Sequence, residues 1–177
     1  MFFDLPMFTL IHVVISVLGV IAGLIVVGGL LAGARLDSWT ALFLATTIYT
    51  SVSGFGFPFT KIAPPHVVGA LSLVVLGVCL VARYGKHLDG PWRATYVVTA
   101  VVALYLNVFV LIVQLFAKTP ALAQLAPTQR EAPFAVTQAL FFGLFAWVAR
   151  AALQRFKRTA SPSPVTATQT TAEQAAG

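Results

Sequence analysis

Five long apolar segments, separated by short stretches that hold nearly all of the charge, constrain this chain more than any other feature. They cover residues 7–33, 38–57, 66–82, 94–117 and 133–153. A helix needs about 20 apolar residues to cross the ~30 Å hydrocarbon core of a bilayer. An isolated strand would leave its backbone groups without partners in lipid, so each crossing segment must be helical. The sequence therefore predicts an all-α integral membrane bundle of five transmembrane helices.

The composition leaves no room for a separate soluble domain. Hydrophobic residues make up 59% of the 177 residues and charged residues only 9%, whereas soluble domains carry about 25% charged residues. We expect residues 1–158 to form a single transmembrane helical domain. Ser, Pro, Thr, Gln and Ala dominate residues 159–177, and a segment this poor in large apolar side chains is expected to be a disordered tail.

The basic residues predict an orientation. With the N-terminus outside, three basic residues fall on the outer side and eight on the inner side, namely Arg35, Arg83, Lys86, Arg93, Arg150, Arg155, Lys157 and Arg158. Lys and Arg favour the cytoplasmic side of membrane proteins, so we expect the C-terminus to be cytoplasmic. The net charge of +6 is explained in this way, and no pattern of aromatic and basic residues indicates nucleic-acid binding.

Glycines four residues apart mark the first segment. Gly19 pairs with Gly23 in this spacing, and Gly29 pairs with Gly33. Such pairs clear one face of a helix, so that another backbone can approach closely. Packing within the chain is the favoured use, and contact with a second copy or with a membrane partner is the alternative.

The predicted topology brings scattered polar residues to one depth, in the outer half of the bundle. We expect an outward-opening polar pocket, with Asn107 as its floor, that binds or passes a small or lipid-like molecule. The predicted ligand-binding residues are His12, Ser53, His66, Asn107, Gln114 and Gln138. The alternative is structural, because hydroxyls in membrane helices often bond their own backbone and amides often hold helices together.

Two other functions stay open. Imidazoles of His12 and His66, on different helices at similar depth, are ligands that haem iron or copper accepts, which would give a redox subunit. The other is a structural subunit of a membrane complex that packs against a partner. An enzyme is not expected, because no Asp or Glu lies inside any segment and no serine-nucleophile motif occurs. Cys79, the only cysteine, excludes an intrachain disulfide.

Two short stretches carry a resemblance. They are Lys61-Ile62-Ala63-Pro64-Pro65-His66, which enters the third segment, and Leu125-Ala126-Pro127-Thr128-Gln129, which lies before the fifth. With the five-segment pattern, they resemble small polytopic bacterial inner-membrane proteins of uncharacterised activity. The resemblance implies a multi-pass protein of the bacterial plasma membrane and implies nothing about mechanism.

Overall fold

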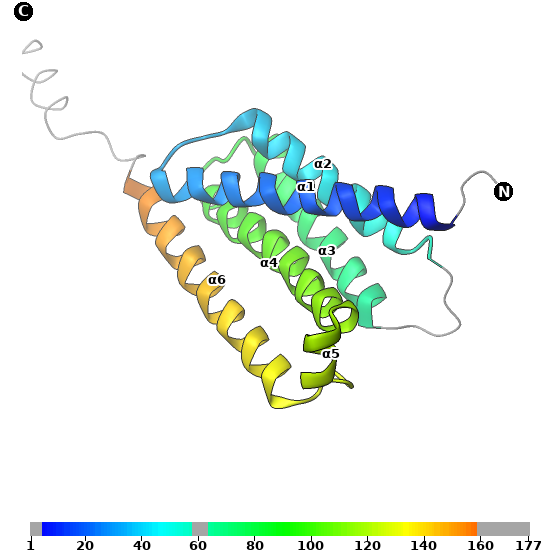
Figure 1. Ribbon diagram of the computed structural model, residues 1–177. Helices are drawn as coiled ribbons and strands as arrows, with labels where there is room; N and C mark the ends of the chain where they lie inside the picture. The colour runs from blue at the N-terminus through cyan, green and yellow to red at the C-terminus, as the bar shows by residue number, and fades with distance from the viewer. Residues whose placement is uncertain (1–4, 58–63, 159–177) are drawn as a thin grey trace, which may run out of the picture.

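The chain folds into long helices joined by short turns (Figure 1). The computed structural model describes residues 5–57 and 64–158. The helices are α1 (Leu5–Ala32), α2 (Asp37–Gly54), α3 (Pro64–Leu80), η1 (Val81–Gly85), α4 (Trp92–Lys118), α5 (Pro120–Leu125) and α6 (Ala132–Arg158). The described residues contain no strand, which confirms the predicted all-α class.

Helix extends into two stretches that were expected to be non-helical. The stretch 118–132, expected to be a loop, contains the short helix α5, which begins at Pro120 after the extended residue Thr119. Proline suits the first turn of a helix, where its missing N–H would have no partner in any case. The last helix continues past residue 153 to Arg158, because Phe156 still packs into the core. The predicted disordered tail, 159–177, lies outside the described residues.

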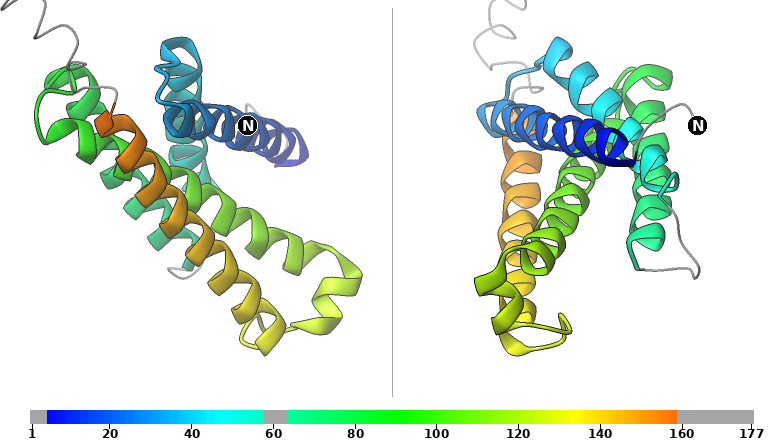
Figure 2. Two further views of the ribbon diagram at one scale, coloured as in Figure 1. Left: turned by 90° about the vertical axis from the view of Figure 1, so that its left-hand side faces the viewer. Right: turned by 45° about the vertical axis from the view of Figure 1, so that its right-hand side comes forward.

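The helices form two layers. α1 and α2 run antiparallel and pack closely against each other, while α3, α4 and α6 form a second layer beneath them (Figures 1 and 2). Figures 1 and 2 show that α1 and α6 meet at their C-terminal ends and diverge towards their N-termini. The helices therefore converge at one end of the bundle and spread apart at the other.

α4 is the centre of the packing. It contacts α1, α3, α5, α6 and the η1 turn, and it contributes ten buried side chains, among which Tyr96, Val97, Ala100, Ala103 and Leu104 are at most 1% exposed. The small residues Ala100 and Ala103 let neighbouring helices approach this face closely. α4 thus organises both layers around one core.

Glycine sets the close approach of α1 to α2. A Cβ added to Gly19 would lie 3.1 Å from the Thr46 hydroxyl, and one added to Gly23 would lie 2.8 Å from the Phe43 ring and 2.6 Å from Leu104. These two glycines therefore serve contacts within the chain. Contact of Gly29 or Gly33 with a partner stays a prediction.

The surface is that of a membrane protein. Among the described helices, α1, the combined α3–η1 segment, α4 and α6 are long and apolar enough to cross a bilayer. Large apolar side chains such as Val74, Leu140, Phe142 and Trp147 are more than half exposed, which water would disfavour and lipid would not.

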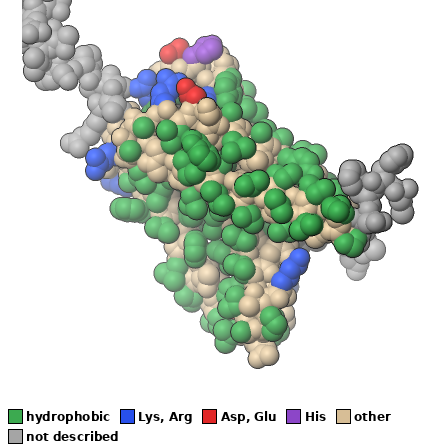
Figure 3. All heavy atoms as spheres, turned by 45° about the horizontal axis from the view of Figure 1, so that its top comes forward, with side chains coloured by type: hydrophobic (Ala, Val, Ile, Leu, Met, Phe, Trp, Pro, Cys, Tyr) green, Lys and Arg blue, Asp and Glu red, His purple; other side chains and the backbone are tan. Residues whose placement is uncertain are grey.

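The charged side chains lie mainly at one end of the bundle, as Figure 3 shows on one face. Arg35, Arg83, Lys86 and Arg93 lie where α1 and α6 end and where α2 and α4 begin. We call this the basic end. Lys118 and Arg130 belong to the opposite end, where α4 ends and α6 begins.

The close approach at Gly23 makes a first prediction. Gly23→Ala should destabilise the protein by about 1–3 kcal/mol, because its methyl group would overpack the fully buried Phe43 and Leu104 side chains. Gly28→Ala on the same helix should cost nothing, because no atom lies within 4 Å of its added Cβ. Equilibrium unfolding in detergent measures both. Equal stability of the two variants would contradict the assigned α1–α2 packing.

Candidate functional site

α2 differs from the other long helices because it is polar. It holds four threonines and three serines in 18 residues, and it is not among the helices apolar enough to cross a membrane alone. It nevertheless packs against α1 on one side and α3 on the other. Thr40, Thr47 and Ser51 are buried. A polar group held in apolar surroundings needs hydrogen-bond partners, and the partners of α2 define the candidate site.

At the end of the bundle opposite the basic end, α2 bonds to α1. The His12 Nδ1 atom lies 2.8 Å from the Ser53 hydroxyl. One turn deeper, the Ser16 hydroxyl donates to its own helix at the His12 carbonyl oxygen (2.6 Å) and approaches the Thr50 hydroxyl at 3.3 Å. All four side chains are half-buried. They form a small uncharged polar cluster between two helices.

Aromatic rings lie beside the histidine of this cluster and beside His66. The Phe57 ring meets the His12 ring edge-on, with 5.1 Å between centroids, and Phe8 packs on Phe57 at 5.0 Å. The His66 ring lies 5.9 Å from the Phe55 ring at the start of α3. Both predicted histidines therefore contact phenylalanines that follow α2, and the Phe57 ring gives His12 an apolar neighbour.

In the middle of α2, an amide from α4 provides the partner. The Asn107 Nδ2 atom donates to the Thr47 hydroxyl at 3.0 Å, and Thr47 is completely buried. Asn107 thus bonds α4 to the middle of α2, and its role as the floor of a pocket stays a prediction. Sequence reasoning did not single out Thr47.

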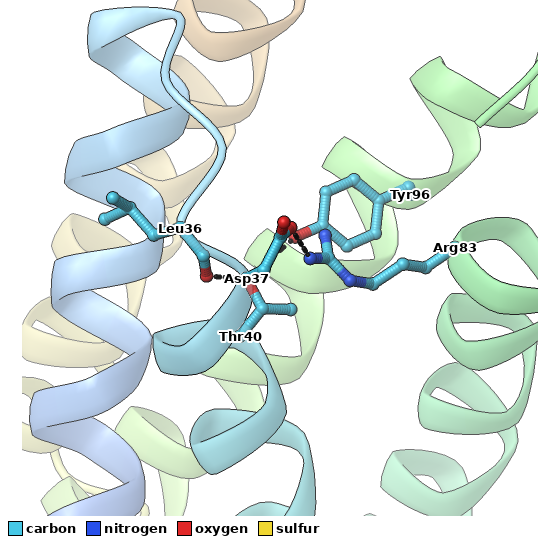
Figure 4. Close-up of polar contacts among 5 residues, drawn as sticks. All are labelled: Leu36, Asp37, Thr40, Arg83 and Tyr96. Atoms are coloured by element: carbon cyan, nitrogen blue, oxygen red, sulfur yellow. Dashed lines mark hydrogen bonds and ion pairs between the residues drawn. The ribbon is translucent and has the colours of Figure 1, made fainter. Parts of the chain in front are cut away.

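At the basic end, α2 is tied to η1 and α4 by charge (Figure 4). Arg83 donates a hydrogen bond to the Asp37 carboxylate. Its guanidinium group also stacks over the Tyr96 ring, 5.2 Å from the centroid. The Tyr96 hydroxyl lies 3.3 Å from the Thr40 hydroxyl, which donates to the Leu36 carbonyl oxygen at 2.8 Å. These five residues connect three segments of the chain.

The burial of Arg83 explains why it needs these contacts. Its side chain is 5% exposed, whereas that of Asp37 is 76% exposed. A buried charge is costly unless it is paired, and the aromatic ring adds a cation–π contact. Asp37 reaches Arg83 from the solvent side, so this pair marks the boundary between the core and the polar end of the bundle.

A π-helical turn places Arg83 inward. Within Val81–Gly85, the Lys86 N–H bonds to the Val81 carbonyl oxygen at 2.8 Å, so the turn holds one more residue than an α-helical turn. Both Ala82 and Arg83 are buried as a result. In the sequence, Arg83 was interpreted only as a sign of membrane orientation. One feature of the sequence could have predicted the ion pair: Asp37 begins one segment at the same end of the bundle where Arg83 ends another.

The remaining predicted residues lie on the α4–α6 side. The Gln138 Nε2 atom on α6 donates to the Phe109 carbonyl oxygen of α4 at 3.3 Å, while its Oε1 atom is buried without a hydrogen-bond partner. Gln114 is exposed on α4. The structure thus brings His12 to Ser53 and Asn107 to α2, whereas Gln138 joins a separate pair of helices.

No metal centre is built from the described residues, since no three His, Cys, Asp or Glu side chains among them lie close enough to hold an ion. A haem or copper site at His12 and His66 stays a prediction. Comparison of the chain with protein-family models, curated proteins and solved structures finds no match.

The Asn107–Thr47 contact makes a second prediction. Asn107→Leu and Thr47→Val should each destabilise the protein by about 1 kcal/mol, and a double-mutant cycle should give a coupling energy of about 0.6–1.7 kcal/mol. Thr95→Val, on the same helix as Asn107, is the matched control, because the Thr95 hydroxyl donates to the Pro91 carbonyl oxygen at the start of that helix. Detergent unfolding measures the single variants and the two double variants that each contain Asn107→Leu. A coupling as small as that between Asn107 and Thr95 would show that this hydrogen bond does not hold α2 to α4.

Proposed function

We propose that this protein is a five-crossing protein of the bacterial inner membrane that binds or passes a small or lipid-like molecule at the polar face of α2. Its N-terminus lies outside and its C-terminus in the cytoplasm. The observation that carries the proposal is the uncharged cluster of His12, Ser53, Ser16 and Thr50 between two membrane helices. No covalent step is assigned to it.

The distribution of charge supports the orientation. Arg35, Arg83, Lys86 and Arg93 share the basic end, and Arg150 and Arg155 lie in the last turns of α6, which ends there. The opposite end holds Lys118 and Arg130 among the described residues. Since Lys and Arg are enriched on the cytoplasmic side, the basic end is the cytoplasmic one, and the His12–Ser53 pair lies towards the outer leaflet.

The polar contacts of α2 support its role as the fifth crossing. Five of its hydroxyls bond to α1, to α4 or to carbonyl oxygens of α2 itself, namely those of Thr40, Thr46, Thr47, Thr50 and Ser53. A helix that satisfies its polar groups in this way avoids the penalty of presenting them to lipid. An odd number of crossings follows from the four apolar helices plus α2.

The chemistry of the cluster favours recognition by hydrogen bonds. An imidazole can donate and accept, and a serine hydroxyl can do both. The aromatic rings of Phe8 and Phe57 supply apolar surface beside His12. A molecule with one polar group and an apolar body fits this combination, which is why we favour a small or lipid-like ligand over an ion.

The third prediction concerns this ligand. The protein is purified in mild detergent, and the molecules that it retains are identified by mass spectrometry. We expect one species in fixed ratio to the protein, reduced about tenfold in Ser53→Ala and in His12→Ala, since one lost hydrogen bond in a low-dielectric site weakens binding by roughly that factor. Ser38→Ala, on the exposed start of α2, is the control.

Two outcomes would contradict this function. If all variants retain the molecule equally, the cluster does not bind it. If the wild type retains no molecule, the proposed ligand does not exist. The absorption spectrum of the same sample tests the redox alternative, because a Soret band lost in His12→Ala would assign haem to this histidine instead.

A further inference from the structure

Two adjoining cavities open at the basic end. The larger, about 340 Å³, lies between the start of α4 and the end of α6, where Ala94, Val97, Leu153 and Phe156 form apolar walls. The smaller, about 170 Å³, lies where the α1–α2 turn meets the start of α4, and Arg35 and Leu88 line it. Arg93 and Phe156 line both cavities, so the two are neighbouring parts of one site.

The smaller cavity is cationic. Arg35 comes from the turn after α1 and Arg93 from the first turn of α4, and no acidic residue is among the lining residues of either cavity. Two acids lie nearby in the chain. Asp37 is paired with Arg83, and Asp89 lies between the lining residues Leu88 and Gly90 but is exposed. Two arginines that line one small space can supply the guanidinium donors that a phosphate accepts.

The walls of this site are held in place by the fold. The Arg93 guanidinium stacks on the Phe156 ring, 5.6 Å from its centroid, and Phe156 is buried. Leu88 is 1% exposed although its φ angle is +63°, a value that L-residues adopt only at a cost in energy. The left-handed conformation of this residue turns the chain between η1 and α4 so that Leu88 closes one wall. The site therefore exists before any ligand enters it.

We propose that this double cavity binds one anionic phospholipid of the cytoplasmic leaflet. Its phosphate lies between Arg35 and Arg93, and the first part of an acyl chain enters the apolar cavity beside Val97 and Leu153. A free phosphate would use only the small cavity. The apolar cavity that continues from Arg93 matches a ligand that is charged at one end and apolar at the other, and the bilayer supplies such a ligand at this end of the bundle.

This site is at the opposite end of the bundle from the His12–Ser53 cluster, and its occupant enters from the other leaflet. The proposal rests on the orientation proposed above, but it does not depend on ligand binding at the outer cluster. The two proposals are separable, because a variant can lose ligand binding at the outer cluster and keep phospholipid binding, or the reverse.

The experiment uses the full chain in detergent, titrated with dioleoylphosphatidylglycerol and followed by native mass spectrometry. The wild type should bind one lipid more tightly than any later one. Arg35→Gln with Arg93→Gln should weaken this first binding event about tenfold or more. Arg150→Gln with Arg155→Gln removes the same charge from exposed positions of α6 that line neither cavity, and it should leave the first event unchanged.

Two further arms test the two halves of the site. Leu153→Trp, which keeps every charge, should weaken the first lipid at least as much as the arginine changes do, because the larger ring fills the apolar cavity. Glycerol phosphate in excess should fail to displace the lipid. Thermal unfolding of each variant confirms that it is folded, and Arg93→Gln alone replaces the double variant if that one unfolds.

Three results would overturn the proposal. The first is equal weakening by the α6 control pair, which would mean general attraction to positive charge. The second is displacement by glycerol phosphate, which would reduce the site to a phosphate site. The third is tight first binding that survives both Leu153→Trp and the arginine changes, which would place the lipid elsewhere.

Discussion

The structure depends on one constraint, which is that a polar helix can lie among membrane helices only when its hydroxyls and amides are bonded inside the protein. α2 meets this constraint near both of its ends and in its middle. Its partners are His12 and Ser16 on α1, Asn107 and Tyr96 on α4, and Arg83 on η1. Each bond is modest in energy, at about 0.5–1.5 kcal/mol, but an unpaired group in the same place would cost more than the bond contributes. The partners therefore fix where α2 lies.

Close packing makes these bonds possible. Gly19 and Gly23 remove side chains from α1 at the positions where Thr46, Phe43 and Leu104 approach. Because the two helices run antiparallel, this register also places Ser16 opposite Thr50 and His12 opposite Ser53. Gly19 and Gly23, whose spacing suits close contact with any second helix, thus bring α1 against α2 of the same chain. The close packing and the polar contacts therefore require the same register between α1 and α2.

The sequence allowed the helices and their polar residues to be predicted, but not which residues would pair. Apolar run length predicted each long helix, because a bilayer requires about 20 residues for one crossing. The pairing of His12 with Ser53, and the contact of Asn107 with α2, depend on helix rotation, which a polar residue's depth does not determine. Gln114 shows the limit, because it shares the predicted depth yet is exposed.

Arg83 escaped prediction for a different reason. Its burial depends on the extra residue of the π-helical turn, and periodicity read at 3.6 residues per turn does not reveal such a turn. Leu88 is similar, because a leucine in a left-handed conformation carries no sequence signal of the kind that glycine gives. Both residues shape the basic end, where the two cavities lie. The sequence was therefore most informative about the apolar helices and least informative about the turns.

Labelling of cysteines at the two ends of α2 tests most directly whether this polar helix crosses the membrane. The only native cysteine, Cys79, is fully buried, so we expect no background labelling from it. Ala34→Cys lies just before α2, and Gly54→Cys at its end has no atom within 4 Å of the new Cβ. In intact cells, an impermeant maleimide should label Gly54→Cys, while Ala34→Cys should react only after permeabilisation. Labelling of both positions from the same side would contradict the account.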